Sequence, residues 1–134
     1  SLRKPLGVVY SSENRDQVAV DDEGWLFEIS DASNLPRLVV DTPLEIGNRL
    51  GPLELAAVND LYFCSSILGQ NLNAKIVNSA LEIKTDRDLV IIISLTESDL
   101  DWRVPLQAIL QRSKIDGKVP HKIDLRFEDP VVVY

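Results

Sequence analysis

The most restrictive feature of this sequence is the run at residues 89–95, which reads LVIIISL. Six of these seven residues are apolar and four of them are β-branched, a composition typical of a strand. Because the run is apolar on both of its alternating faces, it suits a central strand that is covered on each side of a sheet. We therefore expect the rest of the chain to build a sheet around these residues.

Other segments predict the strands that accompany this run. In residues 80–85, apolar and charged side chains alternate, as in a half-buried strand. Residues 2–10 and 18–29 are also apolar and β-prone, and residues 35–40 form a short extended piece. Within residues 18–29, an acidic run ends at Gly24, and glycine readily adopts the positive φ of a tight turn. We expect a hairpin at this turn.

Two segments have apolar residues at helical spacing. The first, residues 52–68, begins with Pro52, which suits a first helical turn, and is followed by Gly69, which suits a helix C-terminus. The second, around residues 100–116, contains Pro105, which favours a start of the helix at that proline. The apolar residues expected to share a face are Leu53, Ala57, Leu61, Cys64 and Leu68 in the first helix, and Leu100, Val104, Ala108 and Ile109 in the second.

These segments together predict an α+β fold. We expect a curved, mostly antiparallel β-sheet with two packed helices, in which the strands come from residues 2–10, 18–29, 80–95 and 121–134. The chain has 134 residues, of which 45% are hydrophobic, so it has enough apolar surface for the core of one domain.

The C-terminal segment alternates between apolar and charged residues and then becomes apolar. If this strand keeps its pleat through Pro130, Val131 and Val133 continue its covered face. Val132 and Tyr134 then point outward. Because proline cannot donate a ladder hydrogen bond, the strand is expected at a sheet edge. An apolar edge of this kind either folds back against the body of the protein or docks a strand of another chain.

The charge balance argues against nucleic acid as a partner. The chain carries 14 Lys and Arg against 21 Asp and Glu, a formal net charge of −7. A negative net charge opposes binding to phosphate backbones and to anionic lipid surfaces. No apolar run approaches the roughly 20 residues that a transmembrane helix needs. We therefore expect no direct contact of these residues with nucleic acid or with a membrane.

Few residues are suited to catalysis or to metal binding. One histidine, His121, and one cysteine, Cys64, cannot supply the ligands of a structural zinc site. Cys64 lies on the apolar face of the first helix, where a buried thiol is expected. Carboxylates such as Asp21, Asp22 and Asp99 leave a small carboxylate-based enzyme as an alternative, although turn and cap chemistry explains their positions. We expect no catalytic residue, no metal and no cofactor.

The order of several short motifs resembles the FtsQ/DivIB family of bacterial cell-division proteins. Residues 3–9 (RKPLGVV) resemble the end of the POTRA module that precedes the β-domain in this family. Residues 20–27 (VDDEGWLF) resemble the entry into the β-domain, and residues 35–36 (LP) match the pair that follows. Residues 123–127 (IDLRF), with Gly117 before them, match the family's final strand motif. The likeness spans nearly the whole chain.

The resemblance implies a membrane-anchored protein that consists of a cytoplasmic tail, one transmembrane helix, a POTRA module and a β-domain. Residues 1–134 are then expected to be the β-domain, with residues 1–10 as a remnant of the end of the POTRA module. The transmembrane helix and the POTRA module are then expected upstream and absent from this chain. The implied location is the extracytoplasmic face of the inner membrane, in the periplasm, at the division septum. Another POTRA-associated envelope assembly module is an alternative.

Members of this family are not enzymes, and they hold the divisome together by binding FtsB and FtsL. An FtsB segment adds a β-strand to the last strand of the β-domain. By position, Arg126 resembles the family's strand arginine, which can pair with an acidic residue, and Phe127 resembles its aromatic contact. Phe127 lacks a tyrosine hydroxyl, and Pro130 stands where a small residue is usual. The implied partner-binding residues are Arg126, Phe127, Asp129, Pro130, Val131, Val132 and Tyr134.

Overall fold

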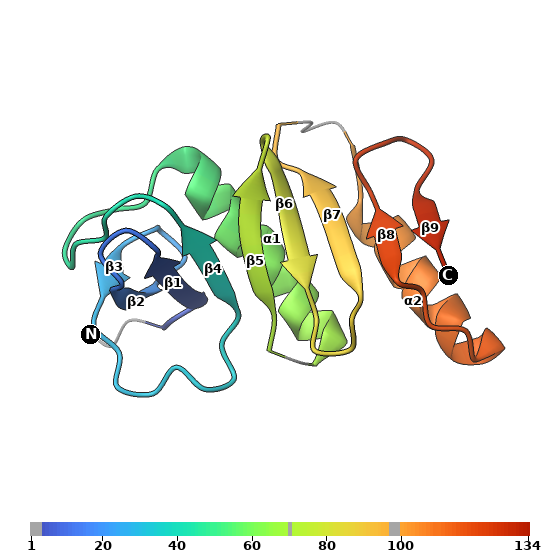
Figure 1. The fold of residues 1–134 in the computed structure, drawn as a ribbon, viewed down its shortest axis with the longest axis horizontal. Coiled ribbons are helices and arrows are strands. Elements are labelled where there is room, and N and C mark those ends of the chain that lie inside the picture. The colour runs from blue at the N-terminus through green and yellow to red at the C-terminus, as the bar shows by residue number, and fades with distance from the viewer. Residues whose placement is uncertain (1–3, 70, 97–99) are drawn as a thin grey trace.

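The computed structural model describes residues 4–69, 71–96 and 100–134. In this part of the chain, nine strands form one mixed sheet, and two helices pack on it (Figure 1). The elements are β1 (Gly7–Ser11), β2 (Gln17–Val20), β3 (Leu26–Phe27), β4 (Arg37–Val40), α1 (Pro52–Leu68), β5 (Asn73–Val77), β6 (Ala80–Lys84), β7 (Val90–Ser94), α2 (Arg103–Asp116), β8 (Lys122–Asp124) and β9 (Val131–Val133).

The strand order across the sheet is β3-β2-β1-β4-β5-β6-β7-β8-β9. Five of the eight neighbouring pairs are antiparallel, and the pairs β1·β4, β4·β5 and β7·β8 are parallel. The predicted α+β fold with a mostly antiparallel sheet is therefore confirmed. The sequence did not predict β5, whose inward-facing positions are occupied by Ala74 and Ile76.

The two helices are crossover connections between neighbouring parallel strands. Helix α1 joins β4 to β5, and helix α2 joins β7 to β8. Both connections step in the same direction along the sheet, between strands that run the same way. Crossovers of this kind are almost always right-handed, which places both helices on the same face of the sheet. Figure 1 shows α1 and α2 together behind the strands.

Helix α1 has the predicted bounds. Pro52 is its first residue, and Gly69 follows it with φ 64°, so that the Gly69 N–H donates to the Ser65 carbonyl at 3.0 Å. This left-handed end is the glycine C-cap that the sequence indicated. The helix buries Ala57, Val58, Leu61 and Cys64.

Helix α2 begins at Arg103, two residues before the predicted start. Pro105 is thus the third residue of the first turn. N–H groups in the first turn have no acceptor within the helix, so the proline removes no helical hydrogen bond. The predicted apolar face is only partly right, because Ile109 packs against the core whereas Val104 is 63% exposed. Apolar residues line two faces of this helix. The face with the bulkier side chains packs against the sheet. The residues of that face are Trp102, Leu106, Ile109 and Leu110.

Strand β7 lies inside the sheet between β6 and β8, as predicted, but it is covered on one face only. Ile91 and Ile93 point toward the helices and are fully buried. Val90 and Ile92 point the other way and are half-buried, since neither helix crosses to that face. The expectation of a strand covered on both sides is therefore wrong. The run is apolar on both faces, but the topology supplies helices for one face only.

The predicted hairpin at the acidic turn is confirmed and joins β2 to β3. The Asp21 Oδ1 accepts hydrogen bonds from the Glu23 and Trp25 N–H groups at 3.0 and 2.9 Å. On the outer side of β3, the Leu26 N–H donates to the Asn48 carbonyl at 2.9 Å, and the Leu26 carbonyl accepts from Gly47 at 3.0 Å. A loop therefore closes this edge of the sheet.

The C-terminal segment is a hairpin and not one continuous strand. Strand β8 ends at Asp124, and the chain turns and returns as β9, antiparallel to β8. Val132 therefore lies opposite Ile123 and packs half-buried against the core. Val131 and Val133 are 49% and 46% exposed. The predicted orientations of Val131, Val132 and Val133 are thus reversed. A straight strand would continue the alternation of faces from β8, but the turn interrupts it. The expected edge position of the last strand is confirmed.

No helix within residues 4–69, 71–96 and 100–134 has the length and hydrophobicity needed to span a membrane.

Candidate functional site: the β9 edge

Strand β9 is the outermost strand at the C-terminal end of the sheet (Figure 1). It pairs with β8 on one side, and no strand of the described chain pairs with it on the other. The opposite edge of the sheet, at β3, is closed by the backbone of Gly47 and Asn48. An unpaired edge can accept a strand from another molecule. Strand β9 is therefore the edge at which this sheet can be extended.

Four apolar side chains around β9 are exposed, and we call them the C-terminal patch: Phe127 at 55%, Val131 at 49%, Val133 at 46% and Tyr134 at 61%. Val131 and Val133 share one face of β9, since they are two residues apart in a strand. Soluble proteins normally protect an edge strand with charged residues, and β9 itself has none. The patch therefore has the apolar character of a binding surface.

The predicted site residues are only partly brought together here. Phe127, Val131 and Tyr134 belong to the patch, whereas Val132 points into the protein. Sequence reasoning missed Val133, because it assigned this residue to the covered face. The signal that could have found it is the Asp-Pro pair at residues 129–130, which is typical of a turn.

Asp129 and Pro130 lie in the segment that connects β8 to β9 and not in a strand. Asp129 is exposed and Pro130 is half-buried. Main-chain contacts between a partner strand and these two residues stay a prediction. Their position outside a strand does not favour such contacts.

Arg126 is engaged within the chain. Its Nε donates to the Asp124 Oδ1 at 2.9 Å, and its Nη2 donates to the Asp124 Oδ2 at 2.6 Å. The Arg126 backbone N–H donates to the same Oδ1 at 3.1 Å. These hydrogen bonds, above all the one from the Arg126 side chain, hold the pKa of the buried Asp124 carboxyl below its ordinary value. The Asp124 carboxylate therefore compensates the charge of Arg126 within the chain itself.

The residues considered for catalysis lie in different settings among the described residues. Asp21 is bound up in the β2–β3 turn, Asp22 is exposed, and Asp99 lies outside the described residues. Cys64 is fully buried, and this burial raises the pKa of its thiol to about 12. His121 is exposed next to the start of β8.

Within the part of the chain that the structure describes, no three His, Cys, Asp or Glu side chains come together as a potential metal site. A comparison with protein-family models and a search of curated proteins both found no match for this sequence.

Proposed function

We propose that this chain is the extracytoplasmic β-domain of an FtsQ/DivIB-type protein, a non-catalytic scaffold of the bacterial divisome at the division septum. Its partners are proteins of the FtsB and FtsL type, and its link to the inner membrane is an upstream transmembrane helix. The order of motifs in the sequence supports this proposal. An α+β sheet that ends in an edge strand at its C-terminal side is compatible with it.

The observation that carries the proposal is the difference between the two edges of the sheet. The outer side of β3 is hydrogen-bonded to a loop, whereas the outer side of β9 has no strand partner among the described residues. The C-terminal patch adds four exposed apolar side chains at the open edge. An apolar edge of this kind is a liability unless another chain covers it.

In the proposed binding mode, an FtsB-type segment adds a strand to β9. Backbone hydrogen bonds supply affinity, and side chains at alternate positions select the partner. Val131 and Val133 point to one face of the extended sheet, so they contact alternate residues of the added strand. Phe127 and Tyr134 extend this contact with two aromatic rings, the residue type that most often dominates binding energy.

The test is a fluorescence anisotropy titration of a labelled FtsB-type C-terminal peptide with this protein. We expect Val133→Lys to weaken binding by roughly tenfold or more, because it places a charge in the apolar contact. The matched control is Val104→Lys in α2, which makes the same change at a valine that is 63% exposed. The control should bind like the wild type.

Strand addition itself is tested with partner peptides that carry one N-methylated backbone amide. Methylation at positions that donate to β9 should abolish binding, and methylation at the alternate positions should not. Equal binding of all methylated peptides, or equal weakening by Val133→Lys and Val104→Lys, would show that the docking site lies elsewhere.

Two other substitutions suggested by the strand pattern are poor tests. Val132→Lys would bury a charge against the core, since Val132 packs on it. Arg126→Glu would place a second carboxylate beside Asp124, whose two oxygens both accept from Arg126. Both changes are expected to disturb the hairpin and would weaken binding for reasons unrelated to a partner.

A further inference from the structure

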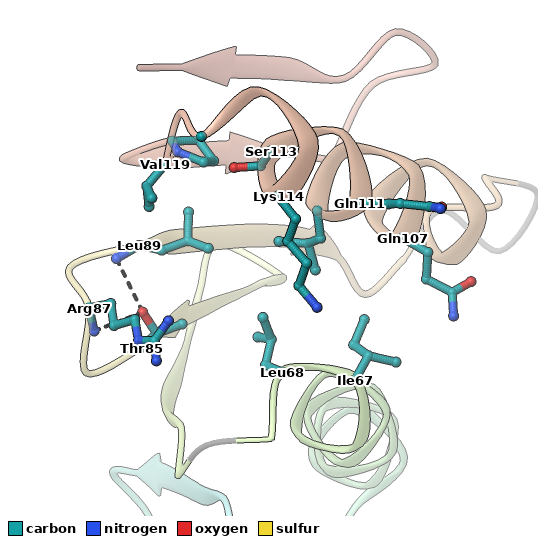
Figure 2. A pocket seen from close by; sticks show the side chains of 13 residues that line it. Ile67, Leu68, Thr85, Arg87, Leu89, Gln107, Gln111, Ser113, Lys114 and Val119 are labelled. Carbon is teal, nitrogen blue, oxygen red and sulfur yellow. Dashed lines mark hydrogen bonds between the residues drawn. The ribbon is translucent and has the colours of Figure 1, made fainter.

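A groove lies on the helix side of the sheet, between the C-terminal part of α1, the middle and end of α2, and the turn that joins β6 to β7 (Figure 2). Its volume is about 450 Å³, which is within the range of ligand sites in proteins. No residue of β9 lines it, so it is separate from the edge described above. Its apolar lining is formed by Ile67, Leu68, Leu89, Leu110, Val119 and Pro120.

The charges of the groove are opposite to the charge of the whole protein. The chain has a net charge of −7, yet among the described residues that line the groove the charged ones are Arg87 and Lys114, both cations. Neither of them has an ion-pair partner within residues 4–69, 71–96 and 100–134. The two acidic residues that flank Arg87 in its turn, Asp86 and Asp88, are exposed and do not line the groove.

The side chains are arranged as an apolar floor below a polar rim. Figure 2 shows Ile67 and Leu68 pointing from α1 into the groove, with Lys114 reaching across it from α2. Gln107 and Gln111 lie one helical turn apart on α2 and line the same groove. This combination favours a ligand with apolar groups for the floor and negative charges for the two cations.

The exposed apolar margin of the groove favours a protein segment over a small molecule. Drug-sized ligands are usually buried over most of their surface, in sites that enclose them. Val119 at its margin is 66% exposed. A ligand confined to the groove would leave much of its own surface and Val119 in water, but a longer segment would cover both.

The backbone around the groove favours a helical segment over an extended one. The strand nearest to it, β7, is paired with β6 on one side and with β8 on the other. It therefore offers no free edge to an extended peptide. A helix satisfies its own backbone and inserts apolar side chains at spacings of three and four residues into a groove.

We propose that this groove binds an amphipathic helix of a partner protein, which places apolar side chains on the floor and acidic side chains next to Arg87 and Lys114. The proposal is independent of strand addition at β9. It assigns a second docking surface to the helix face of the same domain.

The probe is a synthetic amphipathic peptide of about 15 residues, a length at which a helix begins to be stable in water. Its apolar stripe consists of leucines, and glutamates flank the stripe. Two comparison peptides replace either the glutamates by lysines or the leucines by serines. Binding is followed by the shifts of assigned backbone amide signals in NMR spectra. We expect the glutamate peptide to shift the signals of Leu68, Leu89 and Lys114, more weakly as salt concentration rises.

The charge requirement is tested with the double variant Arg87→Glu plus Lys114→Glu, which should weaken binding of the glutamate peptide by roughly tenfold or more. The matched control is Lys84→Glu, an exposed lysine of β6 that does not line the groove, and it should have little effect. A further variant, Val119→Glu, changes an exposed side chain at the margin of the groove and should also repel this peptide.

The proposal is overturned if the lysine peptide binds as well as the glutamate peptide, or if the glutamate peptide shifts only signals outside the groove. It is also overturned if decanoate, an apolar anion, occupies the groove while the peptide does not, because the groove is then a small-molecule site. Since the peptide shifts are read at the groove and Val133→Lys acts at β9, failure of one proposal leaves the other standing.

Discussion

Asp124 and Arg126, two residues apart in the chain, are joined by two side-chain hydrogen bonds of 2.9 and 2.6 Å at the end of β8. Asp124 is only 4% exposed, so its carboxylate depends on these bonds and on the Arg126 N–H for its hydrogen bonding. The pair fixes the point at which the chain leaves β8 and turns toward β9. It therefore positions the edge strand without being part of it.

Asp124→Asn should lower the free energy of unfolding at pH 7 by about 1 to 3 kcal/mol, because it weakens a buried, charge-assisted set of hydrogen bonds. The lowered pKa of Asp124 means that its contribution is present above pH 3.8 and is lost as pH falls through the folded-state value. Urea unfolding between pH 2 and pH 7 measures both effects. Asp129→Asn, at an exposed turn position, is the control and should change little. Equal effects of the two substitutions would contradict this role of Asp124.

Asp60 on α1 gives the opposite pH dependence. Its carboxylate lies 3.8 Å from the Arg103 guanidinium at the start of α2, and burial raises its pKa from 3.8 to about 6, although Arg103 counteracts this shift. The contribution of Asp60 to stability is therefore fully present below pH 3.8 and is lost as pH rises through about 6. Asp60→Asn mimics the neutral form, so the midpoint of thermal unfolding should depend less on pH between 4 and 6.5. Calorimetry at several pH values tests this.

The control for Asp60 is Asp116→Asn, which removes the carboxylate of an exposed ion pair with Arg112 at 3.5 Å. It should keep the pH dependence of the wild type, since exposed ion pairs contribute little to stability. If the unfolding midpoints of Asp60→Asn and the wild type depend on pH in the same way, another group is responsible for the loss of stability between pH 4 and 6.5.

Cys64 is fully buried on the sheet side of α1, and the pKa of its thiol is raised to about 12 by this burial. We expect the native protein at pH 8 to react with iodoacetamide only through unfolding, so that its labelling rate rises steeply with urea. Cys64→Ser should lower the free energy of unfolding by about 1 to 3 kcal/mol, because the hydroxyl is more polar than the thiol. Rapid labelling of the native protein would contradict the buried position.

Gly7 is needed for the close approach of β1 to the chain at Pro36. A Cβ atom at this position would lie 2.8 Å from the Pro36 carbonyl oxygen, the acceptor for the Val8 N–H at 2.9 Å. Gly7→Ala should therefore lower the free energy of unfolding by about 1 to 3 kcal/mol, measured by urea denaturation. Gln17→Ala on β2 changes an exposed side chain in the neighbouring strand and should be close to neutral. If the Gly7→Ala protein were as stable as the wild type, β1 would be able to move away from Pro36.

Local features of the sequence were sufficient for α1 and for the β2–β3 turn. Pro52 and Gly69 bound a helix through their own backbone preferences, and the acidic run that ends at Gly24 supplies the hydrogen bonds of its turn. The alternation in β6 likewise predicted a strand with Leu81 and Ile83 inside, and both are fully buried. Each of these features depends on residues within a few positions of one another.

Part of the candidate site was also predictable. The apolar C-terminal segment and the edge position of the last strand followed from residues 121–134, and Phe127, Val131 and Tyr134 are exposed there. The orientation of Val132 and Val133 was not predictable from alternation alone. Alternation predicts which side chains share a face only within one straight strand. The turn between β8 and β9 interrupts this alternation.

Tertiary structure alone decided which faces of the strands and helices are covered. The run at residues 89–95 fits a strand covered on both sides, but both crossover helices lie on one face, because the two connections have the same hand and direction. On α2, the sequence offers two apolar stripes, and packing against the sheet selects the one that contains Leu106. The sequence by itself determines local conformation through short-range hydrogen bonding and periodicity, whereas pairing partners far apart in the chain determine burial and exposure.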